Sequence, residues 1–117
     1  MIGIDIIEIK RIEKMLEKFG NKALDRFLNP EEKKFISSFS SIAGYWAAKE
    51  AFSKAIGTGI GKECSFLDIK ILKNSKNKPY FSSDTLERFN LKEADLSISH
   101  DGGFAVAAVI VLKKNLV

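Results

Sequence analysis

A stretch crowded with small residues constrains the fold of this chain most. Residues 42–56 contain six alanines or glycines among large apolar side chains, and a glycine-rich segment follows at residues 57–61. Small side chains let neighbouring backbones approach closely, and glycine is common directly after the last turn of a helix. The sequence therefore predicts a closely packed central helix that other elements must surround.

The N-terminal segment has a strand pattern that changes into a helix pattern. Ile2, Ile4 and Ile6 alternate with Gly3 and Asp5, and apolar residues then recur at helical spacing. We expect a short strand that leads into an amphipathic helix. Asp5 would lie on the strand face opposite the isoleucines, away from whatever those side chains bury.

A second helix start is expected near residue 29. An asparagine in the N-cap position precedes a proline and an acidic third helical residue there. Phe35, Ile36 and Phe39 would form the apolar side of this helix. The segment therefore predicts a helix that packs on the core through aromatic residues.

Strand patterns dominate the second half of the chain. The predicted elements are a strand at residues 66–72, a turn at 74–79, a returning strand from 80, a short helix with a capping box at 84–87, and a hairpin formed by 96–100 and 104–112. Helices come early and strands late. This order predicts an α+β fold, in one domain over residues 1–117.

Composition excludes several classes of protein. Cys64 is the only cysteine, so no intramolecular disulfide can form, and one cysteine with one histidine makes no zinc cluster. The longest apolar run, residues 104–112, is well short of the ~20 residues of a membrane-spanning helix. The N-terminus lacks the pattern of an export signal. We therefore expect a cytoplasmic protein with no membrane partner.

The positive charge is concentrated in one part of the chain. The net charge is +4, from 19 basic and 15 acidic residues, and residues 10–34 hold eight basic against five acidic residues, which gives +3. One face of the predicted helix carries three cations and one apolar residue at helical spacing: Arg11, Met15, Lys18 and Lys22. The ordinary explanation for this face is exposure to solvent, and the more specific one is docking of an acidic helix from a partner.

A nucleic-acid partner is the main rival for this basic face. Such a binder would present aromatic side chains among its cations or a helix with base-reading side chains. Most of the nine phenylalanines instead fall at core-like spacings. We therefore expect no nucleic-acid partner.

Two acidic residues lie in apolar surroundings. Asp5 belongs to the predicted strand, and Glu50 lies in the central helix one turn before Lys54. The structural explanation for Asp5 is a solvated residue on an edge strand. The structural explanation for Glu50 is an ordinary helix ion pair with Lys54. A carboxylate pair with a nearby lysine also suits Mg²⁺ and a phosphate. Similarly, His100 beside the hairpin turn could donate to a phosphate or be a turn residue.

The combined motifs resemble the holo-acyl-carrier-protein synthases, the small single-domain type of 4′-phosphopantetheinyl transferase. The resemblance rests on residues 3–12, 46–59, 78–80 and 97–100. It implies a small antiparallel sheet packed against a long central helix and completed by trimerisation, with active sites at subunit interfaces. It also implies Mg²⁺-dependent transfer of the phosphopantetheine arm of coenzyme A to a serine of apo-acyl carrier protein, in fatty acid biosynthesis.

The same resemblance implies roles for individual residues. Asp5 and Glu50 match the magnesium ligands, Lys54 would stabilise charge on the leaving phosphate, and either Glu50 or a metal-bound water would take the serine proton. The residues that match the coenzyme A cleft are Ser53, Lys54, Gly57, Thr58, Gly59, Pro79 and His100. Those that match the helix receiving the acidic carrier protein are Arg11, Met15, Lys18 and Lys22.

Two residues depart from the pattern of the family. Tyr45 stands where relatives often have an arginine that contacts the nucleotide, and Asn77 replaces a usual glycine. Asparagine can adopt the left-handed turn that such a glycine would provide. A carrier-binding module without catalysis is a further alternative, and the presence of both Asp5 and Glu50 favours an enzyme.

Overall fold

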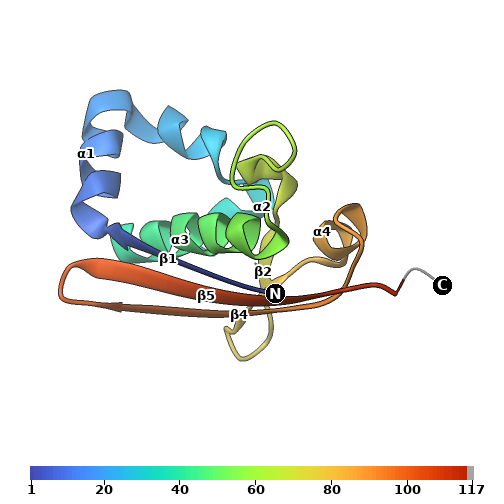
Figure 1. The fold of residues 1–117 in the computed structure, drawn as a ribbon. Helices are drawn as coiled ribbons and strands as arrows, with labels where there is room; N and C mark the ends of the chain where they lie inside the picture. Colours follow the sequence, from blue (N-terminus) through green and yellow to red (C-terminus); the bar gives the residue numbers. More distant parts are fainter. Residues whose placement is uncertain (116–117) are drawn as a thin grey trace.

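The computed structural model describes residues 1–115 and confirms an α+β fold. The elements in chain order are β1 (Ile2–Glu8), α1 (Ile9–Phe19), the 3-10 helix η1 (Gly20–Arg26), α2 (Pro30–Lys33), α3 (Phe39–Ile56), the 3-10 helix η2 (Phe66–Asp68), β2 (Ile71–Lys73), β3 (Pro79–Phe81), α4 (Ser83–Arg88), β4 (Leu91–Asp101) and β5 (Phe104–Lys113) (Figure 1).

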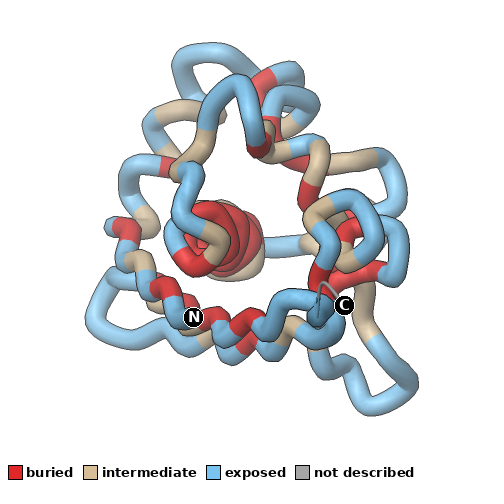
Figure 2. Tube along the Cα trace, turned by 45° about the vertical axis from the view of Figure 1, so that its right-hand side comes forward, coloured by how far each residue is buried: buried red, intermediate tan, exposed pale blue. Residues whose placement is uncertain are grey.

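One antiparallel sheet forms the base of the molecule. Its strand order is β1-β5-β4, and β2 and β3 form a separate two-stranded ribbon. Helix α3 lies along one face of the three-stranded sheet (Figure 1). Figure 2 looks nearly down this helix and shows it as a buried coil with the other elements around it. The predicted central helix is therefore confirmed.

The small residues of α3 allow the sheet to approach its backbone closely. Ala47, Ala48 and Ala51 are fully buried. At Gly3 of β1 the approach is closest, because a Cβ atom built there would lie only 1.9 Å from the carbonyl oxygen of Ala51. The helix ends as predicted at Gly57, whose φ of 89° is in the left-handed region.

The expected orientation of β1 is corrected in one respect. Asp5 does lie opposite the isoleucines, but it faces α3, and the isoleucines are not buried within the chain. Ile2, Ile4 and Ile6 are 70%, 62% and 60% exposed, whereas Gly3 lies against α3. Alternation alone could not show which face of the strand meets the helix.

Three predicted elements have different bounds. Helix α2 has only four residues, so Phe35 and Phe39 are exposed instead of forming its apolar side. The strand expected at residues 66–72 is shortened to β2, because the Asp68 carboxylate accepts from the Ser65 N–H and closes a 3-10 turn. Helix α4 is capped by Ser82, two residues before the predicted start.

The C-terminal hairpin is confirmed, and its first strand starts at Leu91, earlier than predicted. Gly102 and Gly103 form its turn with φ values of 58° and 86°. Two consecutive positive φ angles match the type I′ turn, whose twist suits paired strands. No helix within residues 1–115 has the length and apolarity needed to cross a membrane.

We predict that Gly3→Ala destabilises the protein by about 1–3 kcal/mol in urea denaturation, as overpacking usually does. The added Cβ would collide with the backbone of α3 and force β1 outward. Gly61→Ala is the matched control, because nothing lies within 4 Å of a Cβ at that position. Equal stability of the two variants would contradict the close approach.

Candidate active site

The contact between β1 and α3 brings together two of the predicted catalytic side chains. Lys54 donates a hydrogen bond from Nζ to Asp5 Oδ1 at 2.9 Å and another to the Ile4 carbonyl oxygen at 3.2 Å. The Asp5 side chain is only 15% exposed, whereas that of Lys54 is 51% exposed. A largely buried carboxylate thus meets a half-exposed lysine.

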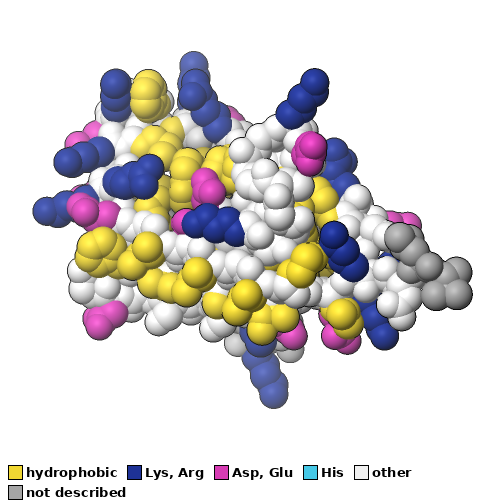
Figure 3. All heavy atoms as spheres, viewed as in Figure 1, with side chains coloured by type: hydrophobic (Ala, Val, Ile, Leu, Met, Phe, Trp, Pro, Cys, Tyr) yellow, Lys and Arg dark blue, Asp and Glu magenta, His cyan; other side chains and the backbone are white. Residues whose placement is uncertain are grey.

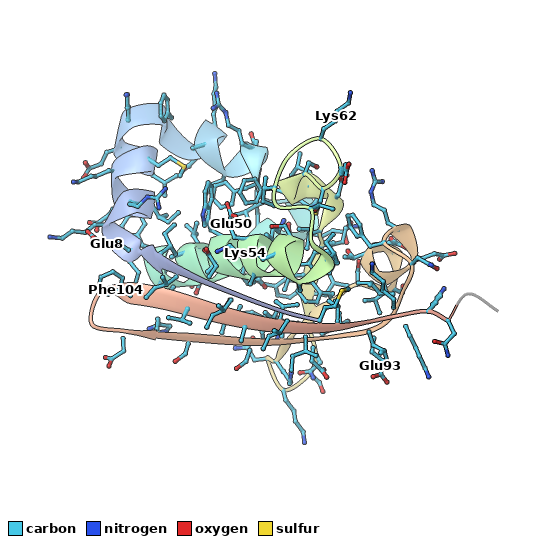
Figure 4. All side chains as sticks on the ribbon, in the orientation of Figure 1. Glu8, Glu50, Lys54, Lys62, Glu93 and Phe104 are labelled. Atoms are coloured by element: carbon cyan, nitrogen blue, oxygen red, sulfur yellow. The ribbon has the colours of Figure 1, made fainter. Side chains whose placement is uncertain are left out.

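Glu50 lies one turn before Lys54 on α3, and Figure 4 shows the two labelled side chains side by side. Partial burial raises the pKa of Glu50, and repulsion from Asp5 raises it further. Lys54 and Arg11 oppose these effects by stabilising the charged form. The two carboxylates are therefore close enough for the charge of one to raise the pKa of the other.

The donor set of this site fits a magnesium ion. Mg²⁺ is usually held by one or two carboxylates and fills its remaining positions with water and substrate oxygens. Asp5 and Glu50 supply such a pair, and within the described residues no third histidine, cysteine or acidic side chain joins them. Such a pair would leave most coordination positions of the ion to water and substrate oxygens.

The loop after α3 is organised by one carbonyl group. The amide N–H groups of Gly57, Thr58 and Gly59 all donate to the Ser53 carbonyl oxygen at 3.1 Å. Ser53 itself is buried, and its hydroxyl donates to the Glu50 carbonyl at 2.7 Å. The three amide groups therefore cap the C-terminal end of α3. The assignment of Ser53, Gly57, Thr58 and Gly59 to the coenzyme A cleft stays a prediction.

Pro79 and His100 line a separate cavity of about 290 Å³. Asn77 also lines it and has a φ of 64°, the left-handed conformation anticipated for this position. Asp5 and Lys54 instead line a cavity with Ile4, Ile6 and Val106. Of the predicted coenzyme A residues, Pro79 and His100 thus share one cavity and Lys54 lines another, while Ser53, Gly57, Thr58 and Gly59 lie at the end of α3 and in the loop after it.

Tyr45 belongs to the cavity of Pro79 and His100 but is itself buried. Its hydroxyl has no hydrogen-bond partner among residues 1–115. Burial, with a smaller contribution from the charge of Glu32, raises its pKa to about 12. Tyr45 therefore remains neutral and cannot replace the charge of an arginine.

An apolar cleft of about 580 Å³ opens between α1 and α3. Met15 and Lys22 of the predicted carrier-protein face line it, together with Phe19, Ala23, Arg26, Phe27, Trp46 and Phe66. Hydrophobic side chains are visible in this region in Figure 3, with basic side chains around them.

The other two residues of the predicted carrier-protein face lie nearby. Lys18 lies above the Phe19 ring, 5.2 Å from its centroid, and Arg11 is exposed near Glu50. The basic face therefore borders both the cleft and the carboxylates.

Sequence reasoning missed the charged pair that is completely buried. Lys49 and Glu32 are completely buried and form an ion pair at 2.7 Å. The available signal was a lysine inside a run of small apolar residues on a helix that had to be buried. Its partner Glu32 lies in α2, and local sequence patterns contain no information on which distant residue a buried lysine will contact.

The sequence and the fold are those of a known class of transferase. Residues 1–109 match the family model of the 4′-phosphopantetheinyl transferase superfamily, and the chain belongs to this superfamily. Within it, the chain is 66% identical to the holo-[acyl-carrier-protein] synthase of Nautilia profundicola, over 97% of this chain and all of that protein.

Solved structures agree with this assignment. The Helicobacter pylori holo-[acyl-carrier-protein] synthase in complex with coenzyme A has a TM-score of 0.87 and 53% identity, and the match covers 95% of this chain and 99% of that one. A Bacillus anthracis synthase in complex with CoA (3′,5′-ADP) has a TM-score of 0.81 and 45% identity, with 97% and 96% covered. The chain therefore shares the fold of these synthases over almost its whole length.

We predict that Glu50→Gln raises the free energy of unfolding at pH 7 in buffer without divalent cations. The folded-state pKa of Glu50 lies above its unfolded value, so its charge destabilises the fold at neutral pH. That cost disappears as the pH falls through the folded-state pKa. Urea denaturation from pH 7 to pH 4 should show the advantage of the variant shrinking, and a constant or reversed difference would contradict the repulsion.

Proposed function

We propose that this chain transfers the 4′-phosphopantetheine arm of coenzyme A to a serine hydroxyl of apo-acyl carrier protein. The products would be holo-acyl carrier protein and adenosine 3′,5′-bisphosphate, and the reaction would support fatty acid biosynthesis. The observation that carries the proposal is the convergence of Asp5, Glu50 and Lys54 where β1 meets α3. The close relatives named above are synthases of this kind, and two of them bind coenzyme A.

Asp5 and Glu50 would hold Mg²⁺ in the working enzyme. When bound, this ion would neutralise charge that grows on the pyrophosphate of coenzyme A. Lys54 now pairs with Asp5 and would exchange that carboxylate for a phosphate oxygen once substrate and cation arrive. Its flexible stem and half-exposed position permit the exchange, and its charge would stabilise the leaving phosphate.

Glu50 is one candidate for the general base, and a water bound to the ion is the other. Burial and the neighbouring Asp5 raise the pKa of Glu50, whereas a cation held by the same carboxylate would lower it, so the position of Glu50 and not its pKa supports this role. The serine hydroxyl of the carrier protein would lose its proton to this carboxylate as its oxygen attacks the phosphorus. Lys54 would meanwhile hold the departing group.

The outer face of the sheet supports assembly into a homotrimer. This face carries Ile2, Ile4 and Ile6 of β1 beside Phe104, Ile110 and Leu112 of β5, which are 42–70% exposed. Figure 3 shows hydrophobic side chains in a row along these strands. Contiguous apolar surface of this kind usually marks an interface. We assign it to further copies of the chain.

Assembly would also explain the division of the site. Pro79 and His100 line a cavity separate from that of Asp5 and Lys54. A subunit interface could place His100 of one copy against the carboxylates of the next. The coenzyme A site would then be complete only between subunits.

The direct test mixes the purified protein with coenzyme A, Mg²⁺ and apo-acyl carrier protein. Intact-mass spectrometry should show the carrier gaining one phosphopantetheine group. Glu50→Gln should reduce turnover at least 100-fold, because general base catalysis typically contributes about 10²–10⁴-fold. Absence of the mass change, while a known transferase modifies the same carrier sample, would refute the function.

The carrier-docking face makes a separate prediction. Arg11→Glu combined with Lys18→Glu should raise KM for the carrier at least tenfold and leave KM for coenzyme A within about twofold, because charge complementarity mainly governs the protein partner. Lys76→Glu combined with Lys92→Glu, at two exposed positions outside this face, is the charge-matched control. Equal increases in both KM values would argue against docking on this face.

A further inference from the structure

The buried Lys49 ammonium contacts three oxygens from distant parts of the chain. Its Nζ donates to the Phe27 carbonyl at 2.7 Å, to Glu32 Oε1 at 2.7 Å and to the Phe66 carbonyl at 3.0 Å. These contacts use all three donors of the ammonium group. Lys49 thus ties α3 to the segment before α2 and to the start of η2.

The Glu32 carboxylate is equally well satisfied. Its Oε1 accepts from the Asn29 amide N–H at 2.7 Å, in addition to Lys49, and its Oε2 accepts from the Ile71 N–H at 2.9 Å. The pair therefore links α2, the edge of β2 and the central helix. Neither side chain reaches solvent.

Both carbonyls bound by Lys49 belong to aromatic residues of the apolar cleft. The rings of Phe27 and Phe66 pack against Trp46, with centroids 5.0 Å and 4.6 Å from that of Trp46, and against each other at 6.1 Å. All three residues line the cleft. Trp46 lies on α3 one turn before Glu50, so the walls of the cleft and the carboxylate site are built on the same helix.

Stability alone is a weak explanation for this arrangement. A buried ion pair pays a large desolvation cost and is often no more stabilising than an apolar pair of similar volume. A fixed ammonium that holds two backbone carbonyls does, however, define where the two attached aromatic side chains stand. No apolar residue at position 49 could donate to those carbonyls.

We propose that the buried Lys49–Glu32 pair is a positioning device that sets the aromatic walls of the cleft and thereby tunes binding of the carrier protein. This inference rests on the proposed function, because Met15 and Lys22 of the carrier-docking face line the same cleft. Lys49 touches no reacting atom. It acts through Phe27 and Phe66.

The test uses Lys49→Met, Glu32→Gln and the double variant that combines them. In the double variant the buried charge is gone and the glutamine amide still accepts from a backbone N–H, while the Phe27 and Phe66 carbonyls lose their donor. Glu31→Gln is the matched control, because Glu31 lies on the same helix but is exposed and pairs with Lys70 at 3.2 Å. Far-UV circular dichroism and thermal unfolding identify the variants that fold.

Two readouts separate positioning from general support of the fold. Trp46 is the only tryptophan, so its fluorescence reports the cleft whether or not transfer occurs. In the folded double variant we expect the Trp46 emission to shift to longer wavelength and to be quenched more strongly by acrylamide. We also expect KM for the carrier to rise at least about tenfold, with KM for coenzyme A within about twofold, while Glu31→Gln matches the unmodified chain in both readouts.

Other outcomes overturn the inference. Unchanged Trp46 emission and carrier KM in the folded double variant would show that the cleft does not need the pair. A lower kcat with unchanged KM and emission would show only a loss of active protein. Failure of all three variants to fold would make the pair a requirement of the whole fold. If the unmodified chain transfers nothing, the proposed function fails, and the fluorescence result alone decides whether the pair positions the cleft.

Discussion

The site depends on how closely one strand approaches one helix. Gly3 leaves no room for a side chain between β1 and the backbone of α3, and the approach places Asp5 of the strand beside Lys54 of the helix. Glu50 is close enough for its pKa to respond to Asp5. A chain that kept all three functional side chains but separated the two backbones would lose their arrangement.

The same strand serves two surfaces. One face of β1 packs on α3 and carries Asp5, whereas the other presents isoleucines outward. Alternating residues of a single strand therefore supply one carboxylate of the site and an exposed apolar surface. A substitution on the outer face could disturb the site by shifting the strand, because both faces share one backbone.

Much of the architecture could be predicted from local patterns. The small residues of α3, the glycine that ends it and the Gly102–Gly103 turn are short-range features, and the structure confirms them. The proximity of Asp5 to Lys54 was expected from resemblance, and the structure shows the contact. The burial of Lys49 with Glu32 and the outward isoleucines depend on packing between distant segments. Alternation and capping patterns contain no information on such packing.

Magnesium titration of the unmodified chain, followed by thermal unfolding without coenzyme A, tests most directly whether the β1–α3 contact creates a cation site. A ligand at 100 times its Kd should stabilise the fold by about 2.7 kcal/mol, so Tm should rise with magnesium. Asp5→Asn should abolish this rise, whereas Asp84→Asn, at an exposed acid on α4, should keep it. An equal rise in Asp5→Asn, or none in the unmodified chain, would contradict the account.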